Sequence, residues 1–522
     1  MIQSFLHTHG RQIVDESNQP ILMKGWGIGN WLLQEGYMWG MHGQKFDRPR
    51  RIERTIEELV GHESAAHFWQ EFRNQYMNED DINYIQAQGY NSIRLPFNAA
   101  LFLTESGEID ETNFYLIDRF IEWAKKHDLY VWLDMHGAPG GQTGANIDDS
   151  TDDIPNLFMV QSYWQQAIKL WRFIAERYHD EPAVAGYDLL NEPIRPETAA
   201  LQNFDYLLPK LSQFYTETIA AIREVDQKHM FSLEGYHWAS DPSVFVKQYD
   251  DNFVIHFHRY GVLPTNETFE DFLKVSEQFN VPLWLGETGE NINTWFSGMS
   301  KLCEEYEVSY HFWPYKKLGK NNGSLTIKTP DNWDALTDYV EKGIKPGRNT
   351  VDELLDQYLE NCQFKNCQQN QDVDHHILRK APFSYSATAF DDQDYHATTI
   401  RNNFKRFRQG TNIEILAPKE QKPSHFSFDV YLDEYRVRLN DQEYVTYSFE
   451  DVSQNEKLIL TIDIEDTQKD ARLEIIENHQ LTQVISGLTS TVEVTLNGSF
   501  ETDRVQIKAL DGYVALQTIT LA

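Results

Sequence analysis

Short apolar runs and longer amphipathic stretches alternate over roughly the first 345 residues of the chain. Eight of the runs have the length and composition of buried strands, namely residues 21–28, 90–95, 129–135, 183–190, 229–233, 253–257, 282–285 and 308–312. Between most of them, apolar residues recur at helical spacing, as in residues 113–127 and 163–178. Strands that alternate with helices form parallel sheets with right-handed crossovers, so eight such units predict a closed (β/α)8 TIM barrel of the α/β class.

Other segments depart from this alternation. Residues 34–88 are too long for one crossover, and we expect them to hold loops and helices over the mouth of the barrel. Residues 350–362 have a helical pattern, whereas residues 426–432, 457–464, 471–476 and 491–496 mostly alternate apolar with polar. The pattern predicts a barrel at residues 1–348, a helical and polar linker at 349–380, and an all-β sandwich at 381–522.

Composition narrows the possible partners. The net charge of −34 and the pI of about 4.8 argue against nucleic acid and anionic membrane surfaces, because both bind basic patches. No run approaches the ~18 apolar residues of a membrane span, so no membrane span is expected. The first residues lack a basic segment followed by an apolar one, which predicts a cytoplasmic protein, although a secreted mature form stays open. Three cysteines suit neither a disulfide framework nor a metal cage.

Tryptophan is confined to the first part of the chain. All thirteen tryptophans lie at or before Trp333, so the predicted sandwich contains none. Exposed aromatic rings, Trp above all, are the platforms on which the apolar face of a sugar stacks. The sandwich is therefore either a structural buttress or a carbohydrate-binding domain that uses tyrosines, and both interpretations stay open.

Polar and aromatic residues gather at the predicted strand ends. They are Glu35 after the first strand, Arg94 in the second, His136 after the third, Asn191 and Glu192 after the fourth, His258 and Tyr260 after the sixth, Glu287 after the seventh and Trp313 at the end of the eighth. Buried Arg, His and Glu are costly unless they are paired, so convergence at seven strand ends is poorly explained by packing. In a barrel of this type, the carboxyl ends of the strands form the floor of the active site. Two glutamates that each end a buried strand suggest a pair of catalytic carboxyls.

These motifs, in this order, resemble those of glycoside hydrolase family 5, the cellulase-like glycosidases of clan A. The resemblance rests on Asn191-Glu-Pro193, Gly286-Glu287, His258-x-Tyr260 and Arg94, and it covers about residues 15–320. Residues 29–35, 136–142, 67–72 and 80–85 are most similar to the exo-β-1,3-glucanase and β-glucosidase-like branch. Trp26, the acidic loop at residues 146–153 and the sandwich depart from that branch.

The resemblance implies a retaining mechanism, in which one carboxyl attacks the anomeric carbon and the other protonates the leaving oxygen. It makes Glu287 the nucleophile and Glu192 the acid/base, with Arg94 and Tyr260 holding Glu287 ionised and oriented. It also implies that Asn191 bonds the sugar 2-hydroxyl and that His136 and His258 position the sugar and the acid/base. Trp313 would form a platform for the sugar, and Glu35 would bond the hydroxyls at its non-reducing end. It implies no cofactor and no metal, because the carboxyls carry the chemistry.

Several alternatives compete with these roles. Glu234 and Glu290 are rival acids, and a surface ion pair is the alternative for Glu35. His136 and Trp313 have purely structural alternatives. Five further residues are candidates either for a wall beside the leaving group or for packing, namely Tyr37, Trp39, His237, Trp238 and Trp295.

The sequence therefore predicts a retaining hydrolase of a β-glycosidic bond, most consistent with exo action on a β-glucosidic oligosaccharide or small glycoside. The exo interpretation rests on Glu35, on the long insertion at residues 34–88 and on the small substrates available in a cytoplasm. The alternatives are an endo-β-glucanase or mannanase, an exo-glycosidase for another sugar or a glycolipid, and a non-catalytic carbohydrate-binding protein. Transglycosylation competes with hydrolysis, and neither linkage nor oligomeric state is predicted.

Overall fold

The computed structural model describes residues 2–197, 202–403, 407–420, 428–450, 452–453, 456–498 and 502–522. The chain divides into two compact units. The first, which we call the barrel unit, comprises Met1–Arg259, Glu270–Thr288 and Glu307–Gln369. The second, which we call the sandwich unit, comprises Tyr260–Phe269, Gly289–Tyr306 and Asn370–Ala522. The domain boundaries at residues 348 and 381 stay predictions.

Eight parallel strands close into a barrel in the order in which they occur along the chain. They are β3 (Lys24–Gly27), β4 (Ser92–Asn98), β5 (Tyr130–Gly137), β6 (Val184–Asp188), β7 (Met230–Glu234), β8 (Phe253–Arg259), β9 (Leu283–Gly289) and β10 (Ser309–Trp313). The last strand pairs with the first, with Tyr310 opposite Lys24. Each strand falls on one of the eight predicted runs, so the predicted TIM barrel is confirmed.

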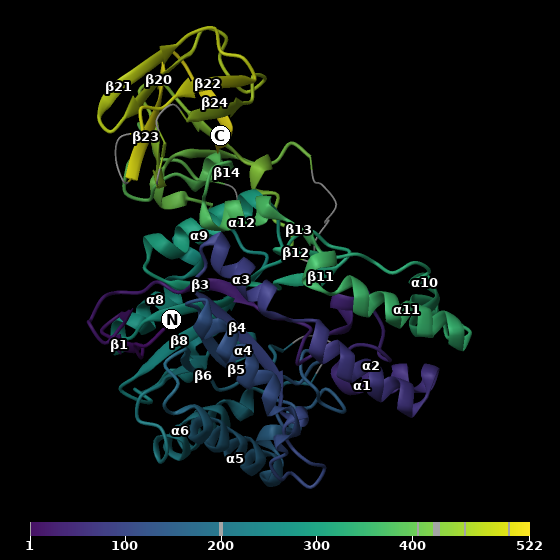
Figure 1. The fold of residues 1–522 in the computed structure, drawn as a ribbon. Helices are drawn as coiled ribbons and strands as arrows, with labels where there is room; N and C mark the ends of the chain where they lie inside the picture. Colours follow the sequence, from purple (N-terminus) through teal and green to yellow (C-terminus); the bar gives the residue numbers. More distant parts are fainter. Residues whose placement is uncertain are drawn as a thin grey trace. The chain divides into compact units, whose positions relative to one another are not determined.

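Amphipathic helices follow the barrel strands. Those of the barrel unit are α4 (Phe114–Lys126), α5 (Gln161–Tyr178), α6 (Leu208–Arg223), α7 (Tyr236–Ala239), α8 (Glu270–Phe279) and α10 (Asp334–Lys342). Helix α4 buries Phe114, Ile117, Phe120, Ile121 and Ala124, a stripe with the helical spacing seen in the sequence. Helices α5 and α6 lie side by side (Figure 1). The helices predicted at residues 113–127 and 163–178 are therefore confirmed.

The insertion at residues 34–88 is largely helical. It contains α1 (Pro49–Val60), α2 (His62–Gln75) and α3 (Glu79–Gln88), and α11 (Arg348–Asn361) packs beside the first two (Figure 1). Trp39 is fully buried here, with its ring stacked on Tyr358 at 4.4 Å between ring centroids. The packing alternative for Trp39 is thus correct, and the ring forms no wall for a ligand.

Two small sheets complete the barrel unit. Strands β1 (His7–His9) and β2 (Gln12–Val14) form a hairpin, and Leu6 before β1 and Ile13 of β2 join a core that includes Trp132 and Trp284. The two tryptophan rings of that core stack at 4.6 Å. The second sheet is built from β11 (Lys316–Leu318), β12 (Leu325–Ile327) and β13 (Gln368–Gln369).

The sandwich unit contains two antiparallel sheets. One is formed by β14 (Phe383–Ser386), β16 (Glu414–Leu416), β17 (Arg436–Leu439), β19 (Lys457–Ile462), β22 (Thr491–Thr495) and β24 (Val514–Leu521). The other is formed by β15 (Tyr395–His396), β18 (Tyr444–Glu450), β20 (Arg472–Glu477), β21 (Gln480–Ile485) and β23 (Thr502–Leu510). Three of the four strands predicted here are confirmed. The fourth predicted strand, at residues 426–432, is wrong for the residues that the structure describes. Residues 428–431 are not in a strand, and Leu432 begins a 3-10 helix. Residues 426 and 427 lie outside the described residues.

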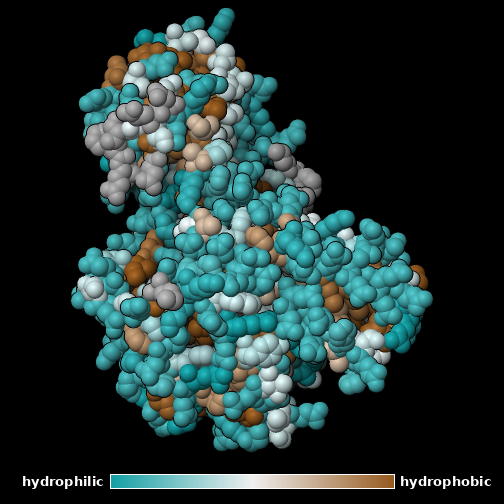
Figure 2. Space-filling model, viewed as in Figure 1, coloured by the Kyte–Doolittle hydropathy of each residue, from teal (hydrophilic) through white to brown (hydrophobic). Residues whose placement is uncertain are grey.

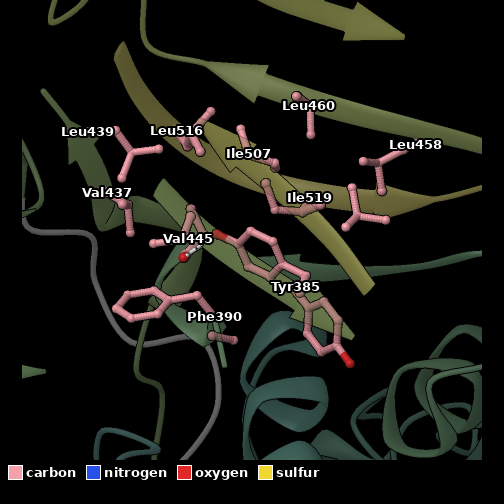
Figure 3. Packing of buried hydrophobic residues seen from close by; sticks show 14 of the residues in the cluster. Tyr385, Phe390, Val437, Leu439, Val445, Leu458, Leu460, Ile507, Leu516 and Ile519 are labelled. Atoms are coloured by element: carbon pink, nitrogen blue, oxygen red, sulfur yellow. Dashed lines mark hydrogen bonds between the residues drawn. The ribbon is translucent and has the colours of Figure 1, made fainter. Parts of the chain in front are cut away.

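Alternating residues of both sheets fill the core of the sandwich. Figure 3 shows Val437, Leu516 and Ile519 from one sheet facing Val445 and Ile507 from the other. Strand β19 alternates fully buried positions with exposed or half-buried ones from Lys457 to Ile462, as the period-two pattern predicted. Helices α9 (Asn293–Glu305) and α12 (Gln371–Leu378) pack against each other and against β14.

The surface shown in Figure 2 is mainly hydrophilic, with small scattered apolar patches. This agrees with a chain of net charge −34. Within the described residues, no helix combines the length and the apolar character that a membrane crossing requires.

Candidate active site

Arg94 lies at the centre of a buried charge cluster at the carboxyl ends of the barrel strands. Its fully buried guanidinium donates from Nη1 to Glu287 Oε2 at 2.7 Å and from Nε to Asp188 Oδ2 at 2.9 Å. Its Nη2 lies 2.9 Å from Glu234 Oε1 and 3.0 Å from Asp134 Oδ2. One cation therefore contacts four carboxyl groups from strands β5, β6, β7 and β9, a concentration of negative charge that proton uptake must offset.

The carboxyl groups around Arg94 differ in proton affinity. Burial raises the pKa of Asp134 and that of Glu234 well above the usual range for a carboxyl. Burial also acts on Asp188, but His256 and Arg94 outweigh it and lower the pKa of Asp188 to about 2. Within the cluster, protons therefore bind more readily to Asp134 and Glu234 than to Asp188.

Glu192 follows β6 in a strained backbone conformation. Its φ is 45°, and Ile194 two residues later has a φ of 56°; such left-handed conformations cost a non-glycine residue about 1–3 kcal/mol. The N–H of Glu192 donates to Glu234 Oε2 at 2.5 Å, and that of Ile194 donates to Gln142 O at 2.9 Å. These bonds hold the turn after β6 and fix the direction in which the Glu192 side chain leaves it.

The two glutamates expected to form the catalytic pair lie close together. A carboxylate oxygen of Glu192 and one of Glu287 are within 4.8 Å of each other, and both lie within that distance of a ring nitrogen of His258. Glu192 Oε1 is 2.8 Å from His258 Nδ1. Burial raises the pKa of Glu192 to about 7; His258 acts in the opposite direction, and the charge of Glu287 adds to the rise. Glu287 thus faces the guanidinium of Arg94, and Glu192 faces the imidazole of His258.

Asn191 is tied to the same cluster. Its Oδ1 accepts from Arg94 Nη2 at 2.8 Å, which orients the side-chain amide and leaves its N–H groups as donors to other partners. Its backbone N–H donates to Met135 O at 3.2 Å, and its backbone O accepts from Gln142 Nε2 at 2.8 Å. The loop after β5 therefore supports the Asn191–Glu192 turn.

His136 and Trp313 lie face to face. Their rings stack at 5.3 Å with an angle of 5° between their planes. His136 Nδ1 is 2.8 Å from Asp134 Oδ2, and burial together with the charge of Arg94 lowers the pKa of His136 to about 3. Trp313 Nε1 donates to the hydroxyl of Tyr37 at 2.9 Å, so Tyr37 has a contact with the expected sugar platform.

The other expected residues have different surroundings. Glu35 is only 6% exposed, which contradicts the alternative of a surface ion pair. Tyr260 belongs to the sandwich unit, where its ring lies 4.7 Å from that of Phe428. Trp295 is fully buried in the same unit and donates to Val262 O, so it packs in the protein interior. Hydrogen bonds, ion pairs and one ring contact join seven of the expected residues into one network, namely Arg94, His136, Asn191, Glu192, His258, Glu287 and Trp313.

Both rival acids have other positions. Glu234 is fully buried, and its two carboxyl oxygens bind Arg94 and the backbone of Glu192. Glu290 belongs to the sandwich unit and has a φ of 51°. Glu234 therefore supports the turn that carries Glu192.

Sequence reasoning missed the supporting charges, namely Asp134, Asp188 and His256. Each lies inside an apolar strand run, where a charged or polar residue has to be paired. The spacing of two residues in Asp134-x-His136 and His256-x-His258 was the available signal, since alternate residues of a strand face the same side.

Two groups of side chains bring possible metal ligands together. They are Glu234 with His256 and His258, and Glu192 with His258 and Glu287. Glu234 and Glu287 already bind the guanidinium of Arg94, and His258 bonds Glu192 and His256. The positive charge at this position comes from an arginine, and the chemistry of paired carboxyls needs no further cation.

Comparison with known proteins gives a family match over the barrel. The model of the family described as Cellulase (glycosyl hydrolase family 5) matches residues 54–327, slightly more than half of the chain. The match contains eight of the nine expected site residues, while Glu35 lies before it.

Three curated proteins illustrate the relatives. Beta-xylosidase of Phanerodontia chrysosporium is 30% identical over 263 residues, which cover 50% of this chain and 52% of that protein. Endoglucanase C of Acetivibrio thermocellus is 30% identical over 198 residues, covering 37% and 53%. Glucan 1,3-beta-glucosidase 1 of Schizosaccharomyces pombe is 23% identical over 360 residues, covering 65% and 82%. The chain thus spans about half the length of the first two.

Proposed function

The chain belongs to glycosyl hydrolase family 5, and from that membership we propose that it hydrolyses a β-glycosidic bond with retention of configuration. The closeness of Glu192 and Glu287, with carboxylate oxygens within 4.8 Å, is the observation that carries this function. Retaining glycosidases hold their two carboxyls about 5–5.5 Å apart, whereas inverting enzymes leave about 6.5–9.5 Å for a water molecule. The spacing here favours the retaining class.

In the first step, Glu287 is the nucleophile and Glu192 the acid. A carboxylate oxygen of Glu287 attacks the anomeric carbon, the bond from that carbon to the leaving oxygen breaks, and the proton of Glu192 moves to the leaving oxygen. Arg94 favours the ionised form of Glu287 by a charge-assisted bond at 2.7 Å. The raised pKa of Glu192, about 7, supplies the protonated partner.

In the second step, water releases the sugar. The Glu192 carboxylate takes a proton from water, the water oxygen bonds to the anomeric carbon, and the ester bond to Glu287 breaks. Both glutamates return to their starting protonation states. Asn191 would donate to the sugar 2-hydroxyl, because Arg94 holds its oxygen and leaves its N–H groups as donors. The stacked ring of Trp313 would support the sugar.

We further propose exo action on a β-glucosidic oligosaccharide or small glycoside. The buried Glu35 and the helical insertion at residues 34–88 support this narrower function, since both suit a site that is closed at one end. Two of the three relatives bear the names of a xylosidase and a glucosidase. Endo action on a β-glucan is the second candidate, and the similarity to Endoglucanase C favours it.

An aryl β-glycoside panel tests the function. Wild type should cleave at least one of the β-glucoside, β-xyloside, β-mannoside and β-galactoside, and proton NMR should show the β-anomer as first product. Glu287→Gln should abolish turnover because an amide does not supply the nucleophile, whereas the matched variant of the rival acid, Glu290→Gln, should stay active. Full activity of Glu287→Gln, or an α-anomer as first product, would refute the retaining assignment.

A second assay separates exo from endo action. An exo enzyme releases monosaccharide from a reducing-end-labelled oligosaccharide while the viscosity of the polymer barely falls. Rapid loss of viscosity with little monosaccharide would instead establish the endo alternative.

A further inference from the structure

The acidic loop at residues 146–153 is folded into the protein and is not a solvated surface. Asp148 and Ser150 are fully buried. Asp148 Oδ2 accepts from the backbone N–H groups of Gln142 and Thr143 and from Thr143 Oγ1, each at 2.9 Å. Its Oδ1 accepts from the N–H of Ser150 at 2.8 Å. One buried carboxyl group, with both oxygens hydrogen-bonded, thus fastens the loop to Gln142 and Thr143.

The helical insertion fastens the same loop from its other side. Arg48, which precedes α1, is fully buried, and its Nη1 donates to Ser150 O at 3.0 Å and to Ser150 Oγ at 2.9 Å. The N–H of Arg50 donates to Asp149 Oδ1 at 2.8 Å, and Asn98 Nδ2 donates to Asp149 Oδ2 at 3.1 Å. The loop is therefore held in one conformation between the start of α1 and the end of β4.

Gln142 joins the ends of two neighbouring barrel strands. Its fully buried side chain donates from Nε2 to His136 O and to Asn191 O, each at 2.8 Å. Its Oε1 accepts from the N–H of Ala138 at 3.0 Å. Both N–H groups and the oxygen have partners, so the amide has one orientation. His136 lies near the end of β5 and Asn191 follows β6, so one amide sets the spacing between these two segments.

The turn after β6 requires such support because its backbone is strained. Glu192 and Ile194 have φ values of 45° and 56°, and strained conformations persist only where the surrounding structure over-determines them. Gln142 binds the carbonyl oxygen that precedes Glu192, and its own backbone oxygen accepts from the N–H of Ile194 at 2.9 Å. Thr143 O accepts from the N–H of Arg195 at 2.7 Å. Gln142 and Thr143 therefore hold the turn at three points.

We propose that Gln142 and Asp148 are positioning residues that hold the backbone of Asn191 and thereby aim its side-chain amide at the sugar 2-hydroxyl. This inference rests on the proposed glycosidase function, in which Asn191 donates to that hydroxyl. Arg94 binds the side-chain oxygen of Asn191, and Gln142 binds its backbone oxygen. With both oxygens fixed, the direction of the side-chain N–H groups is set before the sugar binds. Asp148 acts through Gln142, whose backbone N–H it accepts.

Two variants test this role. Gln142→Met keeps an unbranched side chain of similar length and forms none of the three side-chain hydrogen bonds. Asp148→Asn is milder, because it keeps one side-chain oxygen as an acceptor and replaces the other with a donor. Asn91→Leu is the matched control. The Asn91 side chain also takes part in three hydrogen bonds, but it precedes β4, at the amino ends of the barrel strands.

The measurement compares the aryl β-glycoside that wild type cleaves best with its 2-deoxy counterpart. Contacts to the 2-hydroxyl strengthen in the transition state, so wild type should have the higher kcat/KM on the parent glycoside. A misplacement of about 1 Å can cost about 10²-fold in rate, so Gln142→Met should lower the ratio of the two kcat/KM values at least about tenfold. The loss should lie mainly in kcat. Asp148→Asn should lower the same ratio by a smaller factor.

Asn91→Leu should lower the urea midpoint but keep the wild-type ratio, because its hydrogen bonds do not reach the active site. A wild-type ratio in either folded loop variant, or an equal fall in Asn91→Leu, would overturn the positioning role and leave the glycosidase assignment intact. Failure of both loop variants to fold, while Asn91→Leu folds, would overturn it in favour of a purely structural brace. A wild type that is inert on every β-glycoside would overturn the proposed function itself.

Discussion

Replacing Arg94 with methionine tests whether one buried cation holds the active site together. In Arg94→Met, Asp188 keeps His256 and Ser232, and Glu234 keeps the N–H of Glu192. Glu287 loses the cation 2.7 Å away, and its side chain is only 9% exposed. Leaving one buried charge without its partner costs about 3–5 kcal/mol, so we expect the free energy of unfolding of the barrel unit to fall by that amount at pH 7.

The pH dependence of this loss has a defined sign. Without Arg94, the buried carboxyls have higher pKa values in the folded protein than in the unfolded chain, so the folded state binds more protons. Stability conferred by such groups is greatest at low pH and falls as pH rises through the folded-state pKa. The difference between Arg94→Met and wild type should therefore be smaller at pH 5 than at pH 8.

Urea unfolding followed by tryptophan fluorescence measures the effect, because all thirteen tryptophans except Trp295 lie in the barrel unit. Arg54→Met is the matched control, since Arg54 is 80% exposed in its pair with Glu58 and should change stability by less than about 0.5 kcal/mol. Arg94→Lys should fall between the two, because it keeps the charge and loses the planar fork. A midpoint for Arg94→Met equal to that of the control, or a larger loss at pH 5 than at pH 8, would refute the reasoning.

Three further outcomes are expected. The kcat/KM of wild type for a β-glycoside with a poor leaving group should fall as pH rises through about 7, the pKa of Glu192, because only the protonated acid is active; a profile flat to pH 9 would contradict this. Gly286→Ala should lower kcat/KM at least about tenfold, since its Cβ would displace His256, whereas Gly410→Ala, with nothing within 4 Å, should not. Tyr37→Phe removes the acceptor of the Trp313 N–H and should lower stability by about 1 kcal/mol and raise KM; an unchanged KM would separate Tyr37 from the platform.

The sequence was sufficient for the barrel because its strands are buried on both faces. Such strands appear in the sequence as continuous apolar runs, and Val184–Asp188 and Leu283–Gly289 are buried throughout. The sandwich was predicted less completely, since short strands such as Glu414–Leu416 carry too few alternations to be recognised. The expected strand near residue 430 failed because local alternation does not establish that a partner strand is present.

The sequence predicted the site residues that follow strand ends but not the supporting residues within the strands. Residues after a strand end, such as Glu192 and Glu287, stand out because they interrupt an apolar run. Asp188 and His256 lie within their strands, so their role depends on which strands are neighbours around the barrel. A linear pattern does not contain this information, because the contact between His256 and Asp188 spans 68 residues.

The proposed mechanism requires opposite protonation states of Glu192 and Glu287, and the groups around the two carboxyls favour them. The two carboxyls are within 4.8 Å of each other, so the charge of either one favours a proton on the other. Arg94 favours the ionised form of Glu287, because its Nη1 bonds that carboxyl, whereas the Glu192 carboxyl contacts the imidazole of His258. Burial of the Glu192 carboxyl raises its pKa to about 7, which favours the proton on that member of the pair. The asymmetry that a retaining glycosidase requires would then be set in the buried strands and not by the substrate.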